Sequence, residues 1–361
     1  MKFRLNDLAE VGSSKRIYAK EYKSSGIPFY RGKEIIAKSE GRKIDNSLFI
    51  SKDRYNTLLK KCGVPKENDI LISAVGTIGK VYHVAKSDIP FYFKDGNLIR
   101  IYNYNYSLID PYYLYYLLKS YCGQNAIRKI EIGSTQKAIT INELSSIVLD
   151  IPSLQKQQEI SNKLKKIDAL ISVNSEINDN LLELAKAVFN KNVNSCSKTL
   201  LSNYFLPKRG KNLVKKNVIP GAIPVIAGGL IPAAFHNKSN TMAPVITISA
   251  SGANAGYVQI WGIRVWSSDS SFIDESVSNN IYFWYLLLKK YQKQIYESQT
   301  GSAQPHIYPK NIGNLLIPVV SDETRLNINE KVKPIFNKIF KNKHENNLLN
   351  NLKIILLEKY F

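Results

Sequence analysis

A pattern of seven residues occurs twice in the chain, 168 positions apart. GSTQKAI begins at Gly133 and GSAQPHI begins at Gly301. The repeats of solenoid proteins are about 20–50 residues long, whereas a separation of this size matches a whole domain. The spacing therefore predicts that the 361-residue chain is a tandem duplication of one domain-sized unit.

Segments upstream of the two patterns repeat in the same order. The aromatic stretches PYYLYYLLKSY (111–121) and NIYFWYLLLKKY (280–291) have leucines at helical spacing. Further upstream, ILISAVGTIGKVYHV (70–84) corresponds to ITISASGANAGYVQI (246–260). Both are β-branched runs interrupted by glycine, which is typical of a strand, a turn and a second strand. Each unit is expected to contain both strands and helices.

A long helix is expected at the end of each unit. Apolar residues recur at spacings of three and four over residues 154–190 and again near 322–360, as in a coiled-coil seam. Such helices need a partner, and because a domain separates them in the chain we expect them to pack antiparallel. Pro334 either kinks the second helix or delays its regular part. The predicted seam residues are Ile160, Leu164, Ile167, Ile171, Leu181, Leu184, Val188, Ile328, Val332, Ile335, Ile339, Leu349, Leu352 and Leu356.

These patterns predict an α+β fold, in which a mixed α/β domain followed by a long helix occurs twice and the helices form an antiparallel coiled coil. The predicted division places the domains at 1–152 and 196–319 and the helices at 153–195 and 320–361.

The charge balance favours a polyanionic partner. Lys and Arg number 50 against 29 Asp and Glu, a formal net charge of +21. Residues 1–195 carry 30 basic against 20 acidic residues and residues 196–361 carry 20 against 9, so both halves are basic. Nucleic acid is the first expected partner and an anionic membrane surface the second. Three widely spaced cysteines favour the cytoplasm, and neither a signal peptide nor a membrane span is expected.

The sequence offers little for catalysis. GTIGK (76–80) lacks the spacing of a phosphate-binding loop and is expected to form a turn. The four histidines are scattered, without metal-ligand spacing, and the sequence marks of an adenine methyltransferase do not occur. We therefore expect a binding protein with no catalytic residue, metal or cofactor of its own.

Basic residues interleaved with tyrosine form a cluster in each half, at 13–55 and at 207–216. Lys and Arg neutralise phosphates, whereas Arg, Asn, Gln, Ser and Thr read base edges. Any single charge of this kind more often only solvates a surface, but the clusters taken together favour DNA contact. The candidate DNA-binding residues are Lys15, Arg16, Tyr30, Arg31, Lys33, Arg42, Lys43, Ser134, Thr135, Gln136, Lys137, Lys208, Arg209, Lys211, Ser302, Gln304 and His306.

The layout resembles the specificity subunits of type I restriction–modification systems. The phrase IP-x-L-x-x-Q-x-x-I at 151–160, with GS-x-Q about 20 residues before it, carries the resemblance, and LLIPVVSDETRLNI (315–328) is a weaker second copy. The resemblance covers essentially the whole chain. It implies two target recognition domains, each reading one half of a split double-stranded DNA site, with the helix pair fixing the spacer. It also implies two modification subunits that carry S-adenosylmethionine and methylate adenine N6, and restriction motor–nuclease subunits.

Two other functions fit the same residues. One is the DNA-binding subunit of a two-gene type II enzyme with a bipartite site, which the neighbouring gene would distinguish. The other is a basic coiled-coil scaffold for RNA or membranes, which predicts salt-sensitive binding without base preference.

Overall fold

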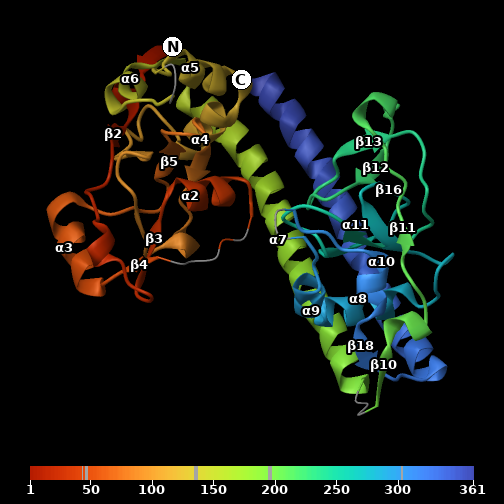
Figure 1. The fold of residues 1–361 in the computed structure, drawn as a ribbon. Coiled ribbons are helices and arrows are strands. Elements are labelled where there is room, and N and C mark those ends of the chain that lie inside the picture. The colour runs from red at the N-terminus through yellow and green to blue at the C-terminus, as the bar shows by residue number, and fades with distance from the viewer. Residues whose placement is uncertain (43, 45–47, 134–136, 194–196, 302–303) are drawn as a thin grey trace. The chain divides into compact units, whose positions relative to one another are not determined.

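The structure is a computed structural model. It describes residues 1–361 except 43, 45–47, 134–136, 194–196 and 302–303. The chain divides into two compact units, the first joining Met1–Leu170 to Leu348–Phe361 and the second spanning Ile171–Asn347. Each of the two long helices contributes to both units (Figure 1). The division into two domains and two helices stays a prediction.

The first unit is built on a four-stranded antiparallel sheet in the order β2–β8–β5–β6. A second sheet has the order β4–β3–β7, with β3 and β7 parallel, and β1 pairs with β9. The strand bounds are β1 Lys2–Arg4, β2 Glu10–Gly12, β3 Ile27–Tyr30, β4 Phe49–Ile50, β5 Ile70–Ser73, β6 Val81–His83, β7 Tyr92–Phe93, β8 Leu98–Tyr102 and β9 Val148–Asp150.

The second unit repeats these pairings. Its sheets have the orders β11–β17–β14–β15 and β13–β12–β16, with β12 and β16 parallel, and β10 pairs with β18. The same strand order and direction in both units confirm the predicted duplication. The strand bounds are β10 Lys198–Leu200, β11 Lys208–Arg209, β12 Ile223–Ile226, β13 Ala234–His236, β14 Val245–Ser249, β15 Val258–Trp261, β16 Trp266–Ser267, β17 Ser270–Ile273 and β18 Leu316–Pro318.

The aromatic stretches form the buried helices α4 and α8. Asp110 caps α4 by accepting a hydrogen bond from the Tyr113 N–H at 2.7 Å, and Pro111 occupies the first turn. None of the described helices is both long and apolar enough to cross a bilayer. The helix bounds are α1 Leu5–Leu8, α2 Gly32–Ser39, α3 Lys52–Cys62, α4 Pro111–Lys119, α5 Tyr121–Lys129, α6 Ile141–Ser146, α7 Leu154–Asn192, α8 Ile281–Lys290, α9 Gln292–Glu297, α10 Pro309–Gly313 and α11 Asp322–Tyr360, with short 3-10 turns η1 Ala19–Glu21, η2 Lys86–Asp88, η3 Leu201–Asn203 and η4 Lys215–Asn217.

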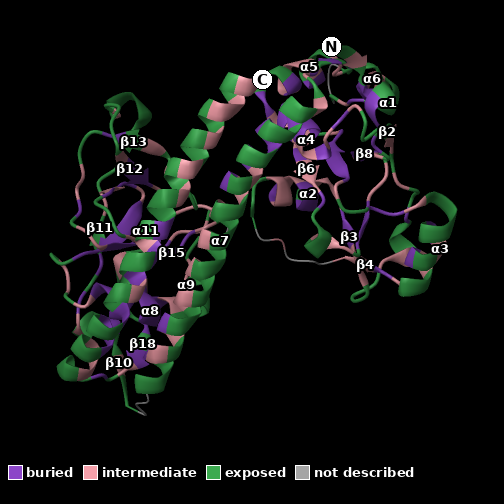
Figure 2. Cartoon of the chain, turned by 180° about the vertical axis from the view of Figure 1, so that it is seen from behind, coloured by how far each residue is buried: buried purple, intermediate pink, exposed green. Residues whose placement is uncertain are grey.

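The core of the second unit forms around α8, in which every residue from Ile281 to Leu288 is buried (Figure 2). Trp284 packs edge-on against Phe205 and Phe283, with ring centroids about 5 Å apart. Aromatic side chains bury large apolar areas and gain further from edge-to-face packing. This helix therefore joins the four-stranded sheet to the long helices, whose residues Phe189 and Phe336 belong to the same core.

The two long helices pair antiparallel, as predicted. In the first unit the Asp168 carboxylate of α7 accepts hydrogen bonds from Lys353 of α11 and from the Tyr116 hydroxyl. In the second unit Asn174 and Asn178 of α7 bond to Asn346 and Asn342 of α11, respectively. Partner numbers fall along α11 as they rise along α7, which is the antiparallel arrangement. The middle of the seam is polar, as the sequence indicates.

Two of the predicted seam positions are wrong. Leu184 and Leu352 are 52% and 45% exposed, whereas Ala185 and Phe189 are buried. An α-helix turns about 100° per residue, so Leu184 lies about 120° away from the face of Ile160, while Ala185 returns to within about 20° of it. The other predicted seam residues are buried or half-buried. Pro334 lies inside a continuous α11, so of the two alternatives a late start of this helix is excluded.

The motif IP-x-L-x-x-Q-x-x-I at the start of α7 has a structural role. Gln157, its central glutamine, is fully buried and donates to the carbonyls of Leu108 and Pro152 while accepting from the Asp110 N–H, at 2.9–3.0 Å. It ties α7 to the loop before α4. In the second unit Asn329 ties α11 to the start of α8, because its Oδ1 accepts a hydrogen bond from the Tyr282 N–H at 3.1 Å. A different residue one turn later therefore replaces the missing glutamine of the second copy.

Candidate nucleic-acid interface

Three segments meet at one end of the four-stranded sheet in the first unit. They are the turn of residues 74–80 between β5 and β6, the turn that leads into β8, and the loop that begins at Gly133. Ala74 joins all three: its N–H donates to the Asn97 carbonyl at 2.8 Å and its carbonyl accepts from the Ile139 N–H at 3.0 Å. Residues from distant parts of the first unit thus share one surface.

The second unit has the same junction. The N–H of Ala250, in the turn between β14 and β15, donates to the Asp269 carbonyl at 3.1 Å, and its carbonyl accepts from the Ile307 N–H at 2.9 Å. Ile139 and Ile307 are the last letters of the two repeated patterns. The repeated letters therefore form the same junction twice. We call each junction the reading end of its unit.

Glycine is required where the repeated loops begin. Gly133 and Gly301 have φ angles of +89° and +90°, a region that other residues rarely adopt. A Cβ on Gly301 would also lie 2.7 Å from the carbonyl oxygen of Gln304. Five of the candidate DNA-binding residues lie outside the described residues and are not placed: Lys43, Ser134, Thr135, Gln136 and Ser302.

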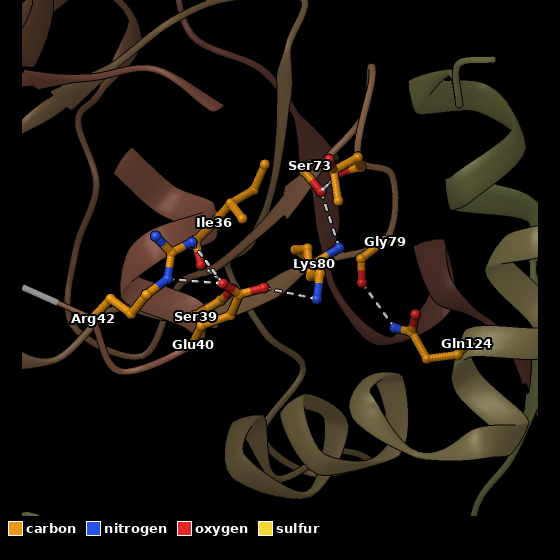
Figure 3. Close-up of polar contacts among 9 residues, drawn as sticks. Ile36, Ser39, Glu40, Arg42, Ser73, Gly79, Lys80 and Gln124 are labelled. Atoms are coloured by element: carbon orange, nitrogen blue, oxygen red, sulfur yellow. Dashed lines mark hydrogen bonds and ion pairs between the residues drawn. The ribbon is translucent and has the colours of Figure 1, made fainter. Parts of the chain in front are cut away.

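The segment GTIGK forms a turn between two strands, as predicted. The Ser73 hydroxyl accepts from the Lys80 N–H at 2.9 Å, and the Gln124 side chain donates to the Gly79 carbonyl at 2.8 Å (Figure 3). In the second unit the Gln292 side chain donates to the Gly256 carbonyl at the same distance. A glutamine from the helix after the buried aromatic helix therefore holds the turn in both units.

An arginine–aspartate pair lies at the reading end of the first unit. Arg16 Nε and Asp95 Oδ2 are 3.1 Å apart, and the arginine side chain is 67% exposed against 19% for the aspartate. The pair borders an open cavity of about 550 Å³. Other residues that line it are Tyr18, Tyr22, Lys94 and Asn97.

A second arginine–aspartate pair lies at the reading end of the second unit. Arg209 Nη2 and Asp269 Oδ1 are 2.8 Å apart. The other carboxylate oxygen of Asp269 accepts a hydrogen bond from the Ser251 hydroxyl. The backbone of Ser251 pairs with His306, which lies in the repeated loop. The turn, the loop and the ion pair therefore form one connected structure.

Several predicted basic residues form exposed ion pairs near these ends. In the first unit Glu40 accepts from both Lys80 and Arg42 (Figure 3). The hydrogen bond from Lys80, and to a lesser extent the one from Arg42, holds the pKa of the Glu40 carboxyl below its usual range. Lys137, in the repeated loop, pairs with Glu131 at 2.9 Å. Lys80 ends the glycine turn, so Arg42 is placed beside the reading end through Glu40.

The remaining predicted residues are accessible to different degrees. Lys15, Lys208, Lys211 and Gln304 are exposed and His306 is half-buried. The Lys208 ammonium donates to the Ser276 carbonyl and hydroxyl. These residues remain candidates for phosphate or base contact.

Tyr30 is a wrong candidate for DNA contact. It is 5% exposed and packs against Phe91 with ring centroids 4.9 Å apart, so it belongs to the core. Phe29 and Tyr30, the last residues of β3, are both buried and belong to different core clusters, so this strand is covered on both faces and the basic residues begin only after it, at Arg31. Arg31 is half-buried and pairs with Glu34 at 2.8 Å, and Lys33 lies 3.7 Å from the same carboxylate. Burial raises the pKa of Glu34, but the hydrogen bonds from Arg31 outweigh it and leave that pKa lowered.

Sequence reasoning missed the acidic members of the site. Asp95 and Asp269 were not candidates, because a search for DNA contacts favours basic and amide side chains. A sequence signal existed for the first, since the Asp95–Gly96 pair marks a tight turn. Asp269 is preceded and followed by serines, and only the three-dimensional pairing with Arg209 shows its place.

The comparisons with known proteins agree with the duplicated layout. The sequence profile of the family described as "Type I restriction modification DNA specificity domain" matches residues 1–183 and 206–351. A protein named as a type I restriction enzyme specificity subunit of Haemophilus influenzae is 34% identical over 167 residues, which cover 46% of this chain and 40% of that protein. A protein named as a type I specificity subunit of Mycoplasma genitalium is 26% identical over 296 residues, covering 74% of this chain and 72% of that one.

A solved structure shares the fold. The crystal structure of the type I restriction–modification S subunit from M. genitalium superposes with a TM-score of 0.63 at 20% identity, over 100% of this chain and 96% of that chain. At this identity the likeness shows the fold alone.

Proposed function

The chain belongs to the family of type I restriction–modification specificity subunits, and we propose that each of its units reads one half of a bipartite double-stranded DNA target. One observation carries the proposal: the same three segments meet at the same end of the same sheet in both units, but present different side chains. A repeated frame with different surface residues suits two different half-sites. Family membership favours this function over the type II subunit and over the scaffold without sequence preference.

The charge of the chain supports DNA as the ligand. A net charge of +21 attracts a polyanion, and lysines that contact phosphates strengthen binding to any sequence. Sequence preference must come from side chains at the reading ends, because phosphate contacts carry no sequence information. The long antiparallel helices would then set the spacer between the half-sites.

Exposed apolar residues on the long helices support docking of protein partners. Leu184 and Leu352 are 168 positions apart and both point away from the seam. Leu184 continues an exposed stripe with Ile177 on α7, and Leu352 continues one with Leu348 on α11. Such stripes mark protein interfaces. Leu184 and Leu352 occupy equivalent positions, which fits two copies of the same partner, whereas Ile177 and Leu348 have Glu345 and Asn180 as their counterparts. We assign them to two modification subunits, which would supply S-adenosylmethionine and the methylation of adenine N6. Restriction motor–nuclease subunits would join this core.

The experiment is co-expression of the chain with the modification subunit encoded beside it, followed by sequencing of methylated adenines in the host genome. The expected result is one bipartite methylated motif that appears only when both proteins are present. Methylation by the purified chain alone, or a motif without two separated halves, would contradict the proposal.

A further inference from the structure

We propose that Asp95 and Asp269 are positioning residues that hold Arg16 and Arg209 for contact with guanine, one in each half of the target. The inference rests on the proposed DNA-reading function and assigns specific residues to it. Its starting point is that two arginine–aspartate pairs lie at the two reading ends, 3.1 Å and 2.8 Å between the bonded atoms.

The two pairs come from the same region of the duplicated fold. Arg209 lies in β11, which pairs with β17, whereas Arg16 lies four residues beyond the end of β2, which pairs with β8. Asp95 lies in the turn before β8, and Asp269 directly precedes β17. In each unit the arginine lies in or after an outer strand of the four-stranded sheet, and the aspartate lies in the turn before the neighbouring strand. The positions are offset between the units, because strand register makes Asn97 the counterpart of Asp269 and Ser13 the counterpart of Arg209.

Stability does not explain the pairs. Ion pairs as exposed as these contribute about 0–1 kcal/mol. A carboxylate on a surface that binds DNA also repels phosphates, so each aspartate weakens binding to DNA in general. Asp95 is 19% exposed and Asp269 34% exposed, less in each case than the arginine that it holds. The arginine is thus the more accessible partner in each pair.

The donors that stay available suit a guanine. Asp95 engages Arg16 at Nε, so that both terminal nitrogens of Arg16 lie outside this hydrogen bond. Two parallel donors from arginine match the O6 and N7 acceptors of guanine in the major groove. Asp269 engages Arg209 at Nη2, which carries two N–H groups, so the second N–H of Nη2 can still act together with the neighbouring donor on the other edge of the guanidinium. A guanidinium fixed on one edge loses less freedom when its other edge binds, which improves discrimination between bases.

The second pair has an additional anchor. Ser251 donates to the Asp269 carboxylate, so both carboxylate oxygens are bonded, one to the arginine and one to the glycine turn. The orientation of Arg209 is thereby tied to the turn and, through the pairing of Ser251 with His306, to the repeated loop.

The test maps methylated motifs for single variants of the full chain in complex with its modification subunits. Arg16→Ala and Arg16→Lys are each expected to relax one base position in one half-site, and Arg209→Ala one position in the other half-site. The lysine variant keeps the charge but lacks the fork of donors. Preference at that position should fall by roughly 5- to 150-fold, the range for one bidentate contact.

The aspartate variants separate positioning from charge. Asp95→Asn removes a negative charge, so electrostatics alone predicts tighter binding to all DNA with an unchanged motif. If Asp95 positions Arg16, Asp95→Asn should relax the base preference at the same position of the motif as Arg16→Ala. Asp269→Asn should likewise relax the base position that Arg209→Ala relaxes. Asp150→Asn is the matched control, because it breaks the exposed ion pair with the Met1 amino group at 2.9 Å, on the β1–β9 sheet. It should leave the motif unchanged.

Two results would overturn the inference. One is an unchanged motif in Asp95→Asn and Asp269→Asn; the other is an unchanged motif in Arg16→Lys. Thermal unfolding of each complex accompanies the mapping, so that misfolding is recognised, and Arg16→Lys provides the variant least disturbing to the fold. Failure of the proposed function is distinguishable, because the wild-type complex would then give no bipartite motif.

Discussion

Asn342 of α11 donates a hydrogen bond from Nδ2 to Oδ1 of Asn178 on α7, at 2.9 Å. The same bond occurs once more nearby, from Asn174 to Asn346 at 3.0 Å. Asn174 and Asn342 are 168 positions apart, as are Asn178 and Asn346. The two donors thus occupy equivalent positions in the duplicated sequence, and so do the two acceptors. The polar middle of the helix pair therefore has internal two-fold symmetry.

These asparagines should fix the register of the helices at a cost in stability. Asn342 is fully buried, and its own Oδ1 has no hydrogen-bond partner among the described residues. Asn178→Leu should destabilise the chain by about 1–3 kcal/mol, because the buried Asn342 amide loses its acceptor. The double variant Asn178→Leu, Asn342→Leu should recover that loss, since both polar partners are replaced by apolar ones. Thermal unfolding measures both.

The exposed Asn180 on α7 offers the control. Asn180→Leu should change the free energy of unfolding by less than about 0.5 kcal/mol. A double variant less stable than Asn178→Leu alone would show that the asparagines stabilise the seam rather than select its register.

Gln157 should be essential for the stability of the first unit, unlike its neighbour. Gln157→Ala leaves two carbonyls and one N–H of half-buried residues without their partner, and a buried group left in this way costs about 1–3 kcal/mol. We expect a loss of roughly 3 kcal/mol or more in the free energy of unfolding, measured by chemical denaturation. Gln158→Ala, at an exposed position, should cost less than about 0.5 kcal/mol. Equal effects of the two changes would rule out the role assigned to the buried glutamine.

Acid should destabilise the first unit through His83. Burial lowers the pKa of His83 to about 4, with Lys165 acting in the same direction and Asp88 opposing it. The ring stacks on Tyr112 with centroids 4.1 Å apart. An unfolded histidine has a pKa near 6.5, so between these values the unfolded state takes up a proton that the folded state refuses. The contribution of His83 to the free energy of unfolding is therefore fully present above about pH 6.5. It is lost as the pH drops towards 4, by up to roughly 3 kcal/mol.

The measurement for His83 is the free energy of unfolding at several pH values from 7 to 4.5. His83→Gln should flatten this slope, whatever it does to stability at pH 7. His344→Gln, at an exposed position on α11, should leave the slope as in the wild type. An unchanged slope in His83→Gln would assign the acid sensitivity to other groups.

The exposed leucines of the long helices should be needed for assembly only. Leu184→Lys and Leu352→Lys should leave the stability of the isolated chain within about 0.5 kcal/mol, because both side chains face solvent. Each single variant should weaken the binding of one modification subunit, and the double variant should weaken the binding of both. The mass of the complex measures how many subunits are bound. Leu59→Lys, at a 47% exposed position on α3, is the control. Full assembly of the double variant would exclude these stripes as the docking surfaces.

Much of the fold was predictable because duplication leaves its mark on the sequence. Ile139 and Ile307 end the repeated patterns and form the same junction, so the repeat alone located both reading ends. The seam was predictable where Ile160 and Leu164 are buried, but a fixed repeat failed at Leu184, because helical rotation carries this residue off the face. The site was predictable in part: Arg16 and Arg209 were identified, while their aspartate partners depend on strand pairing that no local pattern reveals.

The central claim is that the two units read separate half-sites, and one measurement tests it most directly. Residues 1–150 are replaced by the corresponding domain of a relative with a different known motif, the exchanged chain is co-expressed with its modification subunit, and methylated adenines are mapped across the genome. The account predicts that one half of the bipartite motif changes to that of the relative, while the other half stays as in the wild type. Simultaneous change of both halves would contradict independent reading by the two units.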